Sequence, residues 1–305
     1  MGYTFMKVLL AGGSGMIGKK LTFALQHSGH EVAWLGRKKP AALPGGVLFF
    51  EWNPDRLEIS KEAVEWPEGV LNLAGASIGE TKWNTAGRKQ ILESRTLSVK
   101  TLSRAFAGRS TLKSFVGISG AGYYGKGAKA FREDDDAGKD FPAMVAAEWE
   151  KAYQELKESC QPDHFCLLRL GVVLSVEGGA LPKILKPFQM GIGSELGDGK
   201  QPFNWIHEAD AVKIMQAALN WYGIFNASAP ARDTNSSLTK ALGKVMVKPL
   251  ILPPVPGFAL RMLLGERASL VLEGNFSDIS KILSQGFEFQ FSDLKTALED
   301  LLSKK

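Results

Sequence analysis

A tyrosine and a lysine stand four residues apart within the stretch EWEKAYQELK, residues 148–157. On a helix, residues that are four apart lie on the same face, so Tyr153 and Lys157 would be neighbours. A phenol beside an ammonium group is one way to build a proton-transfer pair. Whether this pair can do such chemistry depends on where its helix begins and on what lies at that end.

The second candidate site is the glycine-rich stretch AGGSGMIG near the start of the chain. Its glycines lie between an apolar run of strand length, KVLLAGG, and a helical pattern. Glycine permits a tight turn and a close approach of the backbone to a pyrophosphate, and the N-terminus of the following helix attracts the anion. This context predicts a nucleotide site. The predicted contacts are Gly12, Ser14, Gly15, Met16, Ile17 and Gly18.

The next apolar run ends in a basic turn, WLGRKKP. NAD-selective sites usually carry an acidic residue here, which binds the ribose 2′-hydroxyl. This sequence has Arg37, Lys38 and Lys39 instead, and a guanidinium suits a 2′-phosphate. A solvated basic turn is the alternative, but the place at the strand end favours NADP(H) as the cofactor. Arg37 and Lys38 are the predicted contacts.

Strand-like and helical segments alternate along the chain. Apolar runs of strand length cover residues 7–13, 31–36, 69–75, 114–120 and 165–174, and helical patterns cover 85–106 and 142–160. This alternation predicts an α/β protein with a doubly wound parallel sheet, an NAD(P)-binding Rossmann fold. The predicted Rossmann domain is 6–175, with 208–240 returning to it. A smaller C-terminal domain on the substrate side takes 176–207 and 241–305.

A glycine- and proline-rich stretch, residues 178–205, is too long and irregular for a simple connector, and it is interpreted as a wall of the substrate pocket. The chain has 305 residues and a net charge of +5, with basic and acidic residues interspersed, which argues against nucleic acid as a partner. The leucine-rich segment near residue 260 is interrupted by charges, so we expect a packed helix and no membrane partner.

The two cysteines, Cys160 and Cys166, have no metal-ligand spacing and form no disulfide framework. They therefore predict a reducing compartment, the cytoplasm, and no metal site. A small molecule remains as the expected partner.

The chain resembles an atypical extended short-chain dehydrogenase/reductase, and more narrowly the epimerase-like subfamily with an appended C-terminal domain of unknown function. Some members of this subfamily are labelled cell-division-inhibitor-like. The resemblance rests on NLAGAS (72–77), KQILESR (89–95), SGAGYYG (119–125), LRLGVVL (168–174), GGALPKILKPF (178–188), FNWIHEAD (203–210) and PGFALRMLLGE (256–266). It implies NADP(H) binding and a pocket beneath the second domain. Further implied cofactor contacts are Leu73, Ala74, Gly75 and Gly171. The superfamily also suggests a homodimer formed through two helices that flank the sheet.

In this superfamily a strand-end serine, a tyrosine and a lysine act together: tyrosine transfers the proton, lysine lowers its pKa and serine holds the substrate oxygen. Ser119 occupies the strand-end position. The helix most naturally begins at Pro142, and matching Trp149-Glu150 to the subfamily places the expected tyrosine and lysine at Pro142 and Ala146, which cannot transfer a proton.

Tyr153 lies 11 residues beyond Pro142, about 16 Å along the helix. We therefore expect Tyr153 beside a buried stripe, Lys157 in solvent, and no catalytic role for the pair.

Ser119 remains as a catalytic candidate, with Tyr123 and Tyr124 as phenols that either take part or serve packing. His207 resembles a base oriented by Asp210, but a structural histidine is the simpler interpretation. The predicted function is a reductase or epimerase that acts on an unidentified small carbonyl or sugar-nucleotide-like substrate. The alternative is a non-catalytic NADP(H)-binding sensor or regulatory protein.

Overall fold

A sheet of eight strands dominates the computed structural model, which describes residues 5–303. The strand order is β12-β8-β6-β5-β1-β2-β3-β4. The strands are Lys7–Ala11 (β1), Glu31–Gly36 (β2), Leu48–Asn53 (β3), Glu58–Ile59 (β4), Gly69–Asn72 (β5), Ser114–Gly120 (β6), His164–Leu170 (β8) and Gly223–Ala227 (β12). The pairs β1–β2, β2–β3, β1–β5 and β5–β6 are parallel. The order reverses between β1 and β5, and open α/β sheets bind ligands at the carboxyl ends of strands at such a point.

The chain divides into two compact units. The first holds the chain up to Ser119 with Val145–Leu168 and Val212–Ile224, and the second holds Gly120–Met144, Arg169–Ala211 and the chain from Phe225 onward. The boundaries expected from the sequence follow the alternation of strands and helices, whereas these units follow packing. The sequence-based boundaries therefore stay a prediction.

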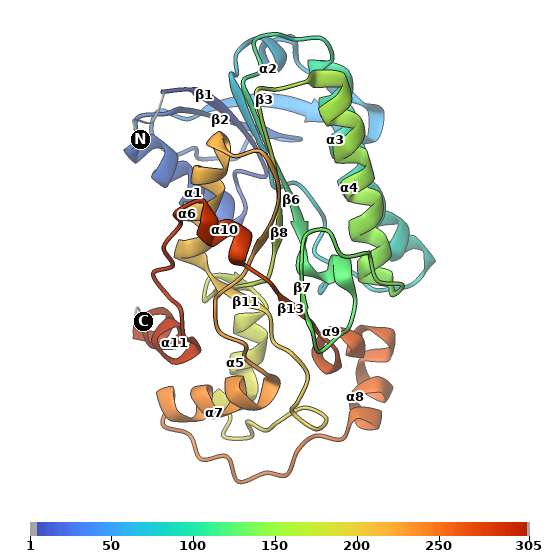
Figure 1. Ribbon diagram of the computed structural model, residues 1–305, viewed down its shortest axis with the longest axis vertical. Helices are drawn as coiled ribbons and strands as arrows, with labels where there is room; N and C mark the ends of the chain where they lie inside the picture. The colour runs from blue at the N-terminus through green and yellow to red at the C-terminus, as the bar shows by residue number, and fades with distance from the viewer. Residues whose placement is uncertain (1–4, 304–305) are drawn as a thin grey trace. The chain divides into compact units, whose positions relative to one another are not determined.

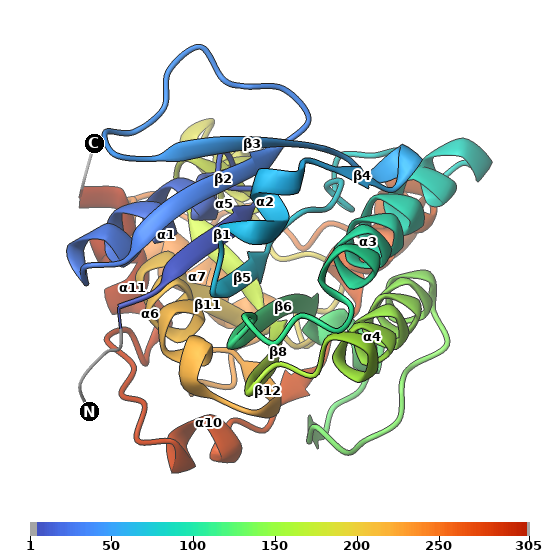
Figure 2. The ribbon, with the colours of Figure 1, turned by 90° about the horizontal axis from the view of Figure 1, so that it is seen from above.

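Helices cover both faces of the sheet in the first unit. Figure 2 shows α1 (Met16–His27) on one face and α3 (Thr85–Phe106) with α4 (Phe141–Cys160) on the other. The hydroxyls of Ser103 and Ser159, 2.9 Å apart, join the ends of α3 and α4. Burial of β1 and β5 along nearly their whole length is typical of parallel strands covered on both faces. The doubly wound α/β architecture is as predicted.

The second unit has a hydrophobic core of its own. A small sheet of Val172–Ser175 (β9), Gly178–Gly179 (β10) and Trp205–His207 (β11) lies with helices Leu181–Gln189 (α5), Asn235–Val245 (α7) and Leu294–Ser303 (α11), which Figure 1 shows. Its buried side chains include Leu174, Leu185, Trp205, Leu242 and Leu298. Helix α5 lies within the stretch expected to be irregular, so that expectation was wrong for residues 181–189. The helix forms because Leu181, Leu185 and Phe188 share one buried face.

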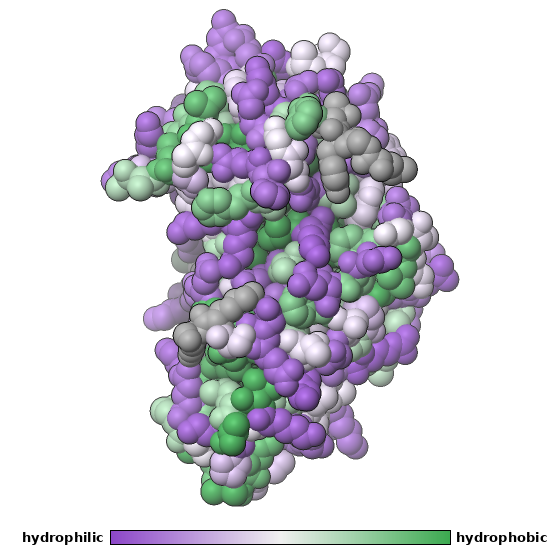
Figure 3. Space-filling view, turned by 90° about the vertical axis from the view of Figure 1, so that its left-hand side faces the viewer, coloured by the Kyte–Doolittle hydropathy of each residue, from purple (hydrophilic) through white to green (hydrophobic). Residues whose placement is uncertain are grey.

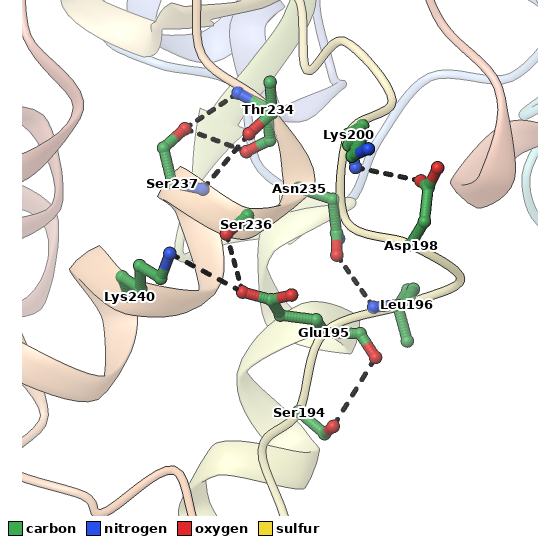
Figure 4. A network of polar contacts seen from close by, with 10 residues as sticks. All are labelled: Ser194, Glu195, Leu196, Asp198, Lys200, Thr234, Asn235, Ser236, Ser237 and Lys240. Carbon is green, nitrogen blue, oxygen red and sulfur yellow. Dashed lines mark hydrogen bonds and ion pairs between the residues drawn. The ribbon is translucent and has the colours of Figure 1, made fainter. Parts of the chain in front are cut away.

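The loop after α5, which contains Glu195 and Leu196, is held to the start of α7 by hydrogen bonds and an ion pair (Figure 4). Asn235 Oδ1 accepts a hydrogen bond from the Leu196 amide at 2.8 Å. Glu195 Oε1 accepts one from Ser236 Oγ at 2.6 Å and lies 3.9 Å from Lys240 Nζ. Helix α7 itself begins with a reciprocal capping box in which Thr234 pairs with the third helical residue. The loop predicted as a pocket wall is thus an ordered part of the second unit.

The apolar run at residues 165–174 is not one strand, as the sequence analysis expected, but two. Strand β8 ends at Leu170, and β9 begins at Val172 in a different sheet, parallel to β11. At the break, a Cβ on Gly171 would lie 3.0 Å from the Asn204 carbonyl oxygen. The strand changes sheets where backbones crowd together, and glycine is the residue that fits there.

The remaining elements are short, apart from α6. They are α2 (Lys61–Glu65), α6 (Glu208–Ala217), α8 (Gly257–Leu264), α9 (Ser269–Leu272), α10 (Ser280–Ser284), β7 (Ala130–Phe131) and β13 (Phe276–Ser277), with 3-10 turns at Pro54–Arg56, Ala121–Tyr124, Ala218–Asn220 and Gly265–Ala268. The leucine-rich segment forms the eight-residue α8, and no helix within residues 5–303 is long and apolar enough to cross a membrane. On the face drawn in Figure 3, hydrophobic side chains form small groups between hydrophilic ones.

Candidate functional site

The glycine turn between β1 and α1 is closed against its own backbone and against the end of β5. Gly12 has φ of +83°, and a Cβ there would lie 3.1 Å from the Leu73 carbonyl carbon. A Cβ on Gly18 would lie 2.3 Å from the Gly12 oxygen, and the Gly15 amide donates to that same oxygen at 3.0 Å. Side chains at Gly12 and Gly18 would therefore force this turn open.

A further glycine in this turn, Gly13, was not identified from the sequence. A Cβ on Gly13 would come 2.3 Å from Cδ1 of Trp34, whose side chain extends from β2. The indole Nε1 of Trp34 donates to Thr22 Oγ1 on α1 at 2.8 Å, which holds the ring in place. No local pattern predicts this contact, because Trp34 lies 21 residues further along the chain.

The other predicted contacts of the first unit follow the same edge of the sheet. Helix α1 begins at Met16 directly after Gly15, which contributes no side-chain cap to the first-turn amides. After β5, the Leu73 amide donates to the Ala11 oxygen at 2.9 Å. The predicted residues are arranged as follows: Ser14 and Gly15 are exposed, Met16 and Ile17 are partly buried at the helix start, and Ala74 and Gly75 continue the loop after Leu73. This glycine turn forms a cradle, and helix α1 begins directly after it, a combination that fits a pyrophosphate.

The basic turn lies at the carboxyl end of β2, next to this cradle in the strand order. Arg37 Nη1 is 3.7 Å from Asp55 Oδ2, with 69% and 66% of the two side chains exposed. Lys38 is also exposed. A surface ion pair this long contributes little to stability, so the Arg37 guanidinium can turn to a phosphate at small cost.

Tyr153 is fully buried, and the expectation that it flanks the buried stripe was wrong. Its ring lies against Gly117 of β6, where a Cβ would be only 2.7 Å away. Its hydroxyl lies 3.1 Å from Asn72 Nδ2, which donates to it. Burial raises the pKa of Tyr153 well above the ordinary range, with smaller opposing effects of hydrogen bonds. The phenol is held as a neutral packing group.

Lys157 was expected to lie in solvent, but its side chain is partly buried. Its Nζ lies 5.0 Å from the ring centroid of Tyr222 and 5.9 Å from that of Phe165. The ammonium group thus lies over aromatic rings. Since its neighbour Tyr153 is buried as a neutral phenol, the structure supports the prediction that Tyr153 and Lys157 are not a proton-transfer pair.

Ser119, at the end of β6, is paired with a carboxylate that the sequence analysis did not single out. Its Oγ donates to Glu150 Oε1 on α4 at 2.7 Å, and only 3% of the residue is exposed. Beside Glu150, the Trp149 ring centroid lies 5.0 Å from the guanidinium carbon of Arg95 on α3. Burial lowers the pKa of Arg95 to about 10, which still leaves it charged. A hydroxyl, a carboxylate and a cation therefore lie near the carboxyl ends of β5 and β6.

The two candidate phenols lie in the second unit. Tyr124 is buried; its hydroxyl donates to Asn226 Oδ1 at 2.6 Å and accepts from Arg169 Nη1 at 2.8 Å. Burial raises the pKa of Tyr124 to about 12, against a smaller lowering by Arg169. Tyr123 is partly buried, and its ring centroid lies 3.6 Å from the Arg169 guanidinium carbon. The Tyr124 hydroxyl both donates and accepts a hydrogen bond within the protein, so its geometry fits packing better than proton transfer.

The segment WIHEAD contacts the C-terminal part of the second unit through Asp210 and His207. Both carboxylate oxygens of Asp210 accept backbone hydrogen bonds, from Gln290 at 2.8 Å and Phe291 at 2.9 Å. His207 stacks on the Phe291 ring with centroids 3.8 Å apart, and its Nε2 lies 3.3 Å from Asp300 Oδ2. His207 is a structural histidine, as the simpler interpretation predicted, and Asp210 is not its orienting partner.

Gly171 also lies in the second unit, where its amide donates to the Ala227 oxygen at 3.0 Å. Within residues 5–303 no group of three or more histidine, cysteine, aspartate or glutamate side chains could hold a metal ion. The fold and the glycine cradle are those of the Rossmann class of nucleotide-binding proteins.

Comparisons with known proteins narrow this class. Residues 8–227 match the NAD dependent epimerase/dehydratase family, and residues 255–301 match a domain of unknown function, DUF1731. Mouse epimerase family protein SDR39U1 is 33% identical over 307 residues, which cover 98% of this chain and 100% of the mouse protein. The chain belongs to the NAD dependent epimerase/dehydratase family, with the additional C-terminal domain that the sequence resemblance predicted.

Two solved structures are also similar. The crystal structure of human epimerase family protein SDR39U1 with NADPH has a TM-score of 0.84 and 28% identity, covering 98% of this chain and 100% of the human one. The nucleoside-diphosphate sugar epimerase from Corynebacterium glutamicum has a TM-score of 0.78 and 27% identity, covering 98% of this chain and 58% of that one. Both agree with the predicted fold class along nearly the whole chain.

Proposed function

We propose that this protein binds NADP(H) and catalyses hydride transfer, as a reductase or an epimerase, on a small carbonyl or sugar-nucleotide-like substrate. The observation that carries this proposal is the cradle of Gly12 and Gly18 with an exposed Arg37 at the end of the next strand. The similar human protein is known in a structure with NADPH, which supports the choice of cofactor. The proposal includes cytoplasmic location and a homodimer, with neither nucleic acid nor membrane as a partner.

In this proposal the cofactor's pyrophosphate lies on the glycine cradle, with Ser14, Met16 and Ile17 at the start of α1. Arg37 and Lys38 bind the 2′-phosphate, and residues 73–75 with Gly171 complete the contacts. When bound, the nicotinamide supplies or accepts a hydride, and the chain positions it. Ser119 binds the substrate oxygen. Tyr123 is the remaining candidate phenol, since Tyr124 is held by Asn226 and Arg169.

Calorimetric titration of the full chain with NADPH and NADH tests the cofactor. We expect NADPH to bind at least about tenfold more tightly than NADH, because a charge-assisted bidentate contact forms with the 2′-phosphate. Arg37→Ala should remove most of this preference and leave NADH affinity unchanged. Arg104→Ala, an exposed arginine on α3, is the matched control. Equal losses for both cofactors in Arg37→Ala would rule out the 2′-phosphate role.

The second candidate function is non-catalytic NADP(H) binding by a sensor or regulatory protein. The observation that favours it is the pair Pro142 and Ala146, where the superfamily has its tyrosine and lysine. A screen of carbonyl compounds for NADPH consumption separates the two. A Ser119→Ala protein that binds NADPH normally but no longer consumes it supports the enzyme, whereas tight binding with no consumption by the unaltered protein supports the sensor.

A further inference from the structure

Helix α3 carries a charge where its pattern calls for an apolar side chain. Ile91, Ser98 and Leu102 form a buried stripe along this helix. Arg95 stands between Ile91 and Ser98 at helical spacing, so it shares their face and is partly buried. Burial lowers the pKa of Arg95 to about 10, against a smaller opposing effect of Tyr153. A charge in such a place is costly unless an opposite charge or hydrogen bonds compensate for it.

The chain supplies only part of that compensation. Arg95 Nη1 donates to the Ile91 carbonyl oxygen at 2.9 Å, and its guanidinium carbon lies 5.0 Å from the centroid of the Trp149 ring. Stacking on the ring offsets some of the cost but leaves the other N–H groups of the fork unused. Arg95 forms no ion pair and no other side-chain hydrogen bond within residues 5–303. None of its nitrogens is both buried and without a partner, so the unused N–H groups are open to solvent.

The segment 73–76, here called the β5 loop, lies between Arg95 and the glycine turn. A Cβ on Gly75 would lie 3.4 Å from Arg95 Cγ and 3.5 Å from its Cζ, so the side chain lies against the backbone of this loop. Earlier in the same loop, the Leu73 carbonyl carbon would lie 3.1 Å from a Cβ on Gly12. The β5 loop therefore contacts the cradle with its first residues and Arg95 with its later ones.

Hydrogen bonds from its amides hold the β5 loop in place. Asn72 Oδ1 accepts one from the Ala74 amide at 3.1 Å. Ser94 Oγ, on the residue before Arg95, accepts one from the Ala76 amide at 3.0 Å. The loop and the part of α3 that carries the guanidinium are thus joined before any ligand binds. A group held in advance loses little conformational freedom when it binds an anion.

We propose that Arg95 binds phosphate oxygens of the ligand at this edge of the sheet. A guanidinium fork matches a phosphate group, and the anion supplies the charge that the chain leaves out. This site rests on the proposed nucleotide-dependent function. The pyrophosphate of NADP(H) is the favoured source, because the glycine turn, residues 12–18, has no charged side chain of its own. The phosphates of a sugar-nucleotide-like substrate are the other source.

Calorimetric titration of the full chain with NADPH, NADH and UDP tests the site. We expect Arg95→Met to weaken NADPH and NADH by about tenfold or more and by equal factors, because both contain the pyrophosphate. Arg37→Ala, in contrast, should affect NADPH alone. Methionine keeps a long side chain beside the Trp149 ring, so a role of Arg95 in packing alone predicts unchanged affinities. Arg104→Met, at an exposed arginine of α3, is the matched control.

The outcomes distinguish the sources of phosphate. If Arg95→Met binds both cofactors normally but its complex with NADPH binds UDP more weakly than the unaltered complex does, Arg95 contacts the substrate's phosphates. Unchanged affinities for all the nucleotides overturn this site and leave the proposed function intact. Failure of the unaltered protein to bind NADPH or NADH overturns the proposed function and the site with it. Thermal melting of each variant checks its fold. Arg95→Lys, which keeps the charge without the fork, should recover part of the affinity if Arg95→Met is unstable.

Discussion

Two regions of the molecule each contain a polar group beside a carboxylate, and they are built in different ways. In the first unit, Ser119 and Glu150 meet at the carboxyl end of β6. In the second, His207 lies beside Asp300 and stacks on the aromatic ring of Phe291. Nδ1 of His207 accepts a hydrogen bond from the Ala209 amide at 3.1 Å, and its Nε2 lies 3.3 Å from Asp300 Oδ2.

The difference teaches that the type of residue says less about chemistry than its position relative to the sheet. Histidine and aspartate look more catalytic than serine and glutamate, yet the histidine pair secures the C-terminal segment. The serine pair lies at the sheet edge where the glycine turn and the β5 loop also lie. Four changes break or sharpen this contrast.

The largest effect is expected in the glycine turn of the first region. Gly18→Ala places a Cβ 2.3 Å from the Gly12 oxygen, and neighbouring backbone cannot yield without opening the turn. We expect a loss of about 3 kcal/mol in the free energy of unfolding, with loss of NADPH binding. Urea denaturation and calorimetry measure the two. Gly45→Ala is the control, since a Cβ at Gly45 meets nothing within 4 Å. Normal NADPH binding by Gly18→Ala would contradict the role of the cradle.

The second region should respond in stability alone. Asp210→Ala leaves the buried amides of Gln290 and Phe291 without their acceptor, at a cost of about 2 kcal/mol. Hydrogen exchange should become faster in residues 290–301, while NADPH affinity remains unchanged. Asp134→Ala, an exposed aspartate of the same unit, is the control. Weakened NADPH binding in Asp210→Ala would break the contrast between the two regions.

Tyr153→Phe tests a group that lies close to the first region but is interpreted as structural. The hydroxyl bonds with Asn72, so we expect a loss of about 1 kcal/mol in the free energy of unfolding. Affinity for NADPH and the rate of any turnover should be unchanged. A protein of normal stability that loses turnover would restore Tyr153 and Lys157 as a catalytic pair.

The smallest effect concerns Tyr124 at alkaline pH. Its pKa is raised to about 12 in the folded protein, against about 10 in the unfolded chain. The folded state therefore favours the neutral phenol, and this stabilisation is present below about pH 10 and is lost as the pH rises toward about 12. At about pH 10.5 the loss is just under about 1 kcal/mol. Tyr124→Phe should show a correspondingly smaller alkaline decline in denaturation experiments, and Tyr222→Phe, at an exposed phenol, should not.

The fold could largely be predicted from the sequence because strands and helices alternate and most strands are continuous apolar runs. Strand β3 was missed because it is only half buried and carries a charged residue, Glu51, and β12 because Asn226 interrupts its apolar run. The split of residues 165–174 depends on crowding at Gly171, which is a contact with distant residues.

In the candidate site, too, contacts between residues far apart in the chain could not be predicted. The glycine turn and the basic turn are local patterns, so they could be found in the sequence. Glu150 could not, because its pairing with Ser119 joins residues 31 apart in the chain. The burial of Tyr153 likewise depends on the missing side chain of Gly117 in another element.

The attachment of the C-terminal segment has a consequence for how this protein is made. Asp210 and His207 find their partners among residues 290–300, about 80 to 90 positions later in synthesis. While a ribosome is still adding that part, the Asp210 carboxylate and the His207 imidazole lack these partners, which have not yet left the exit tunnel. Domains generally fold as units during synthesis. The second unit can therefore complete its core only after residues 290–300 have been synthesised, and translational pausing before that point would prolong the exposure of the unfinished surface to chaperones.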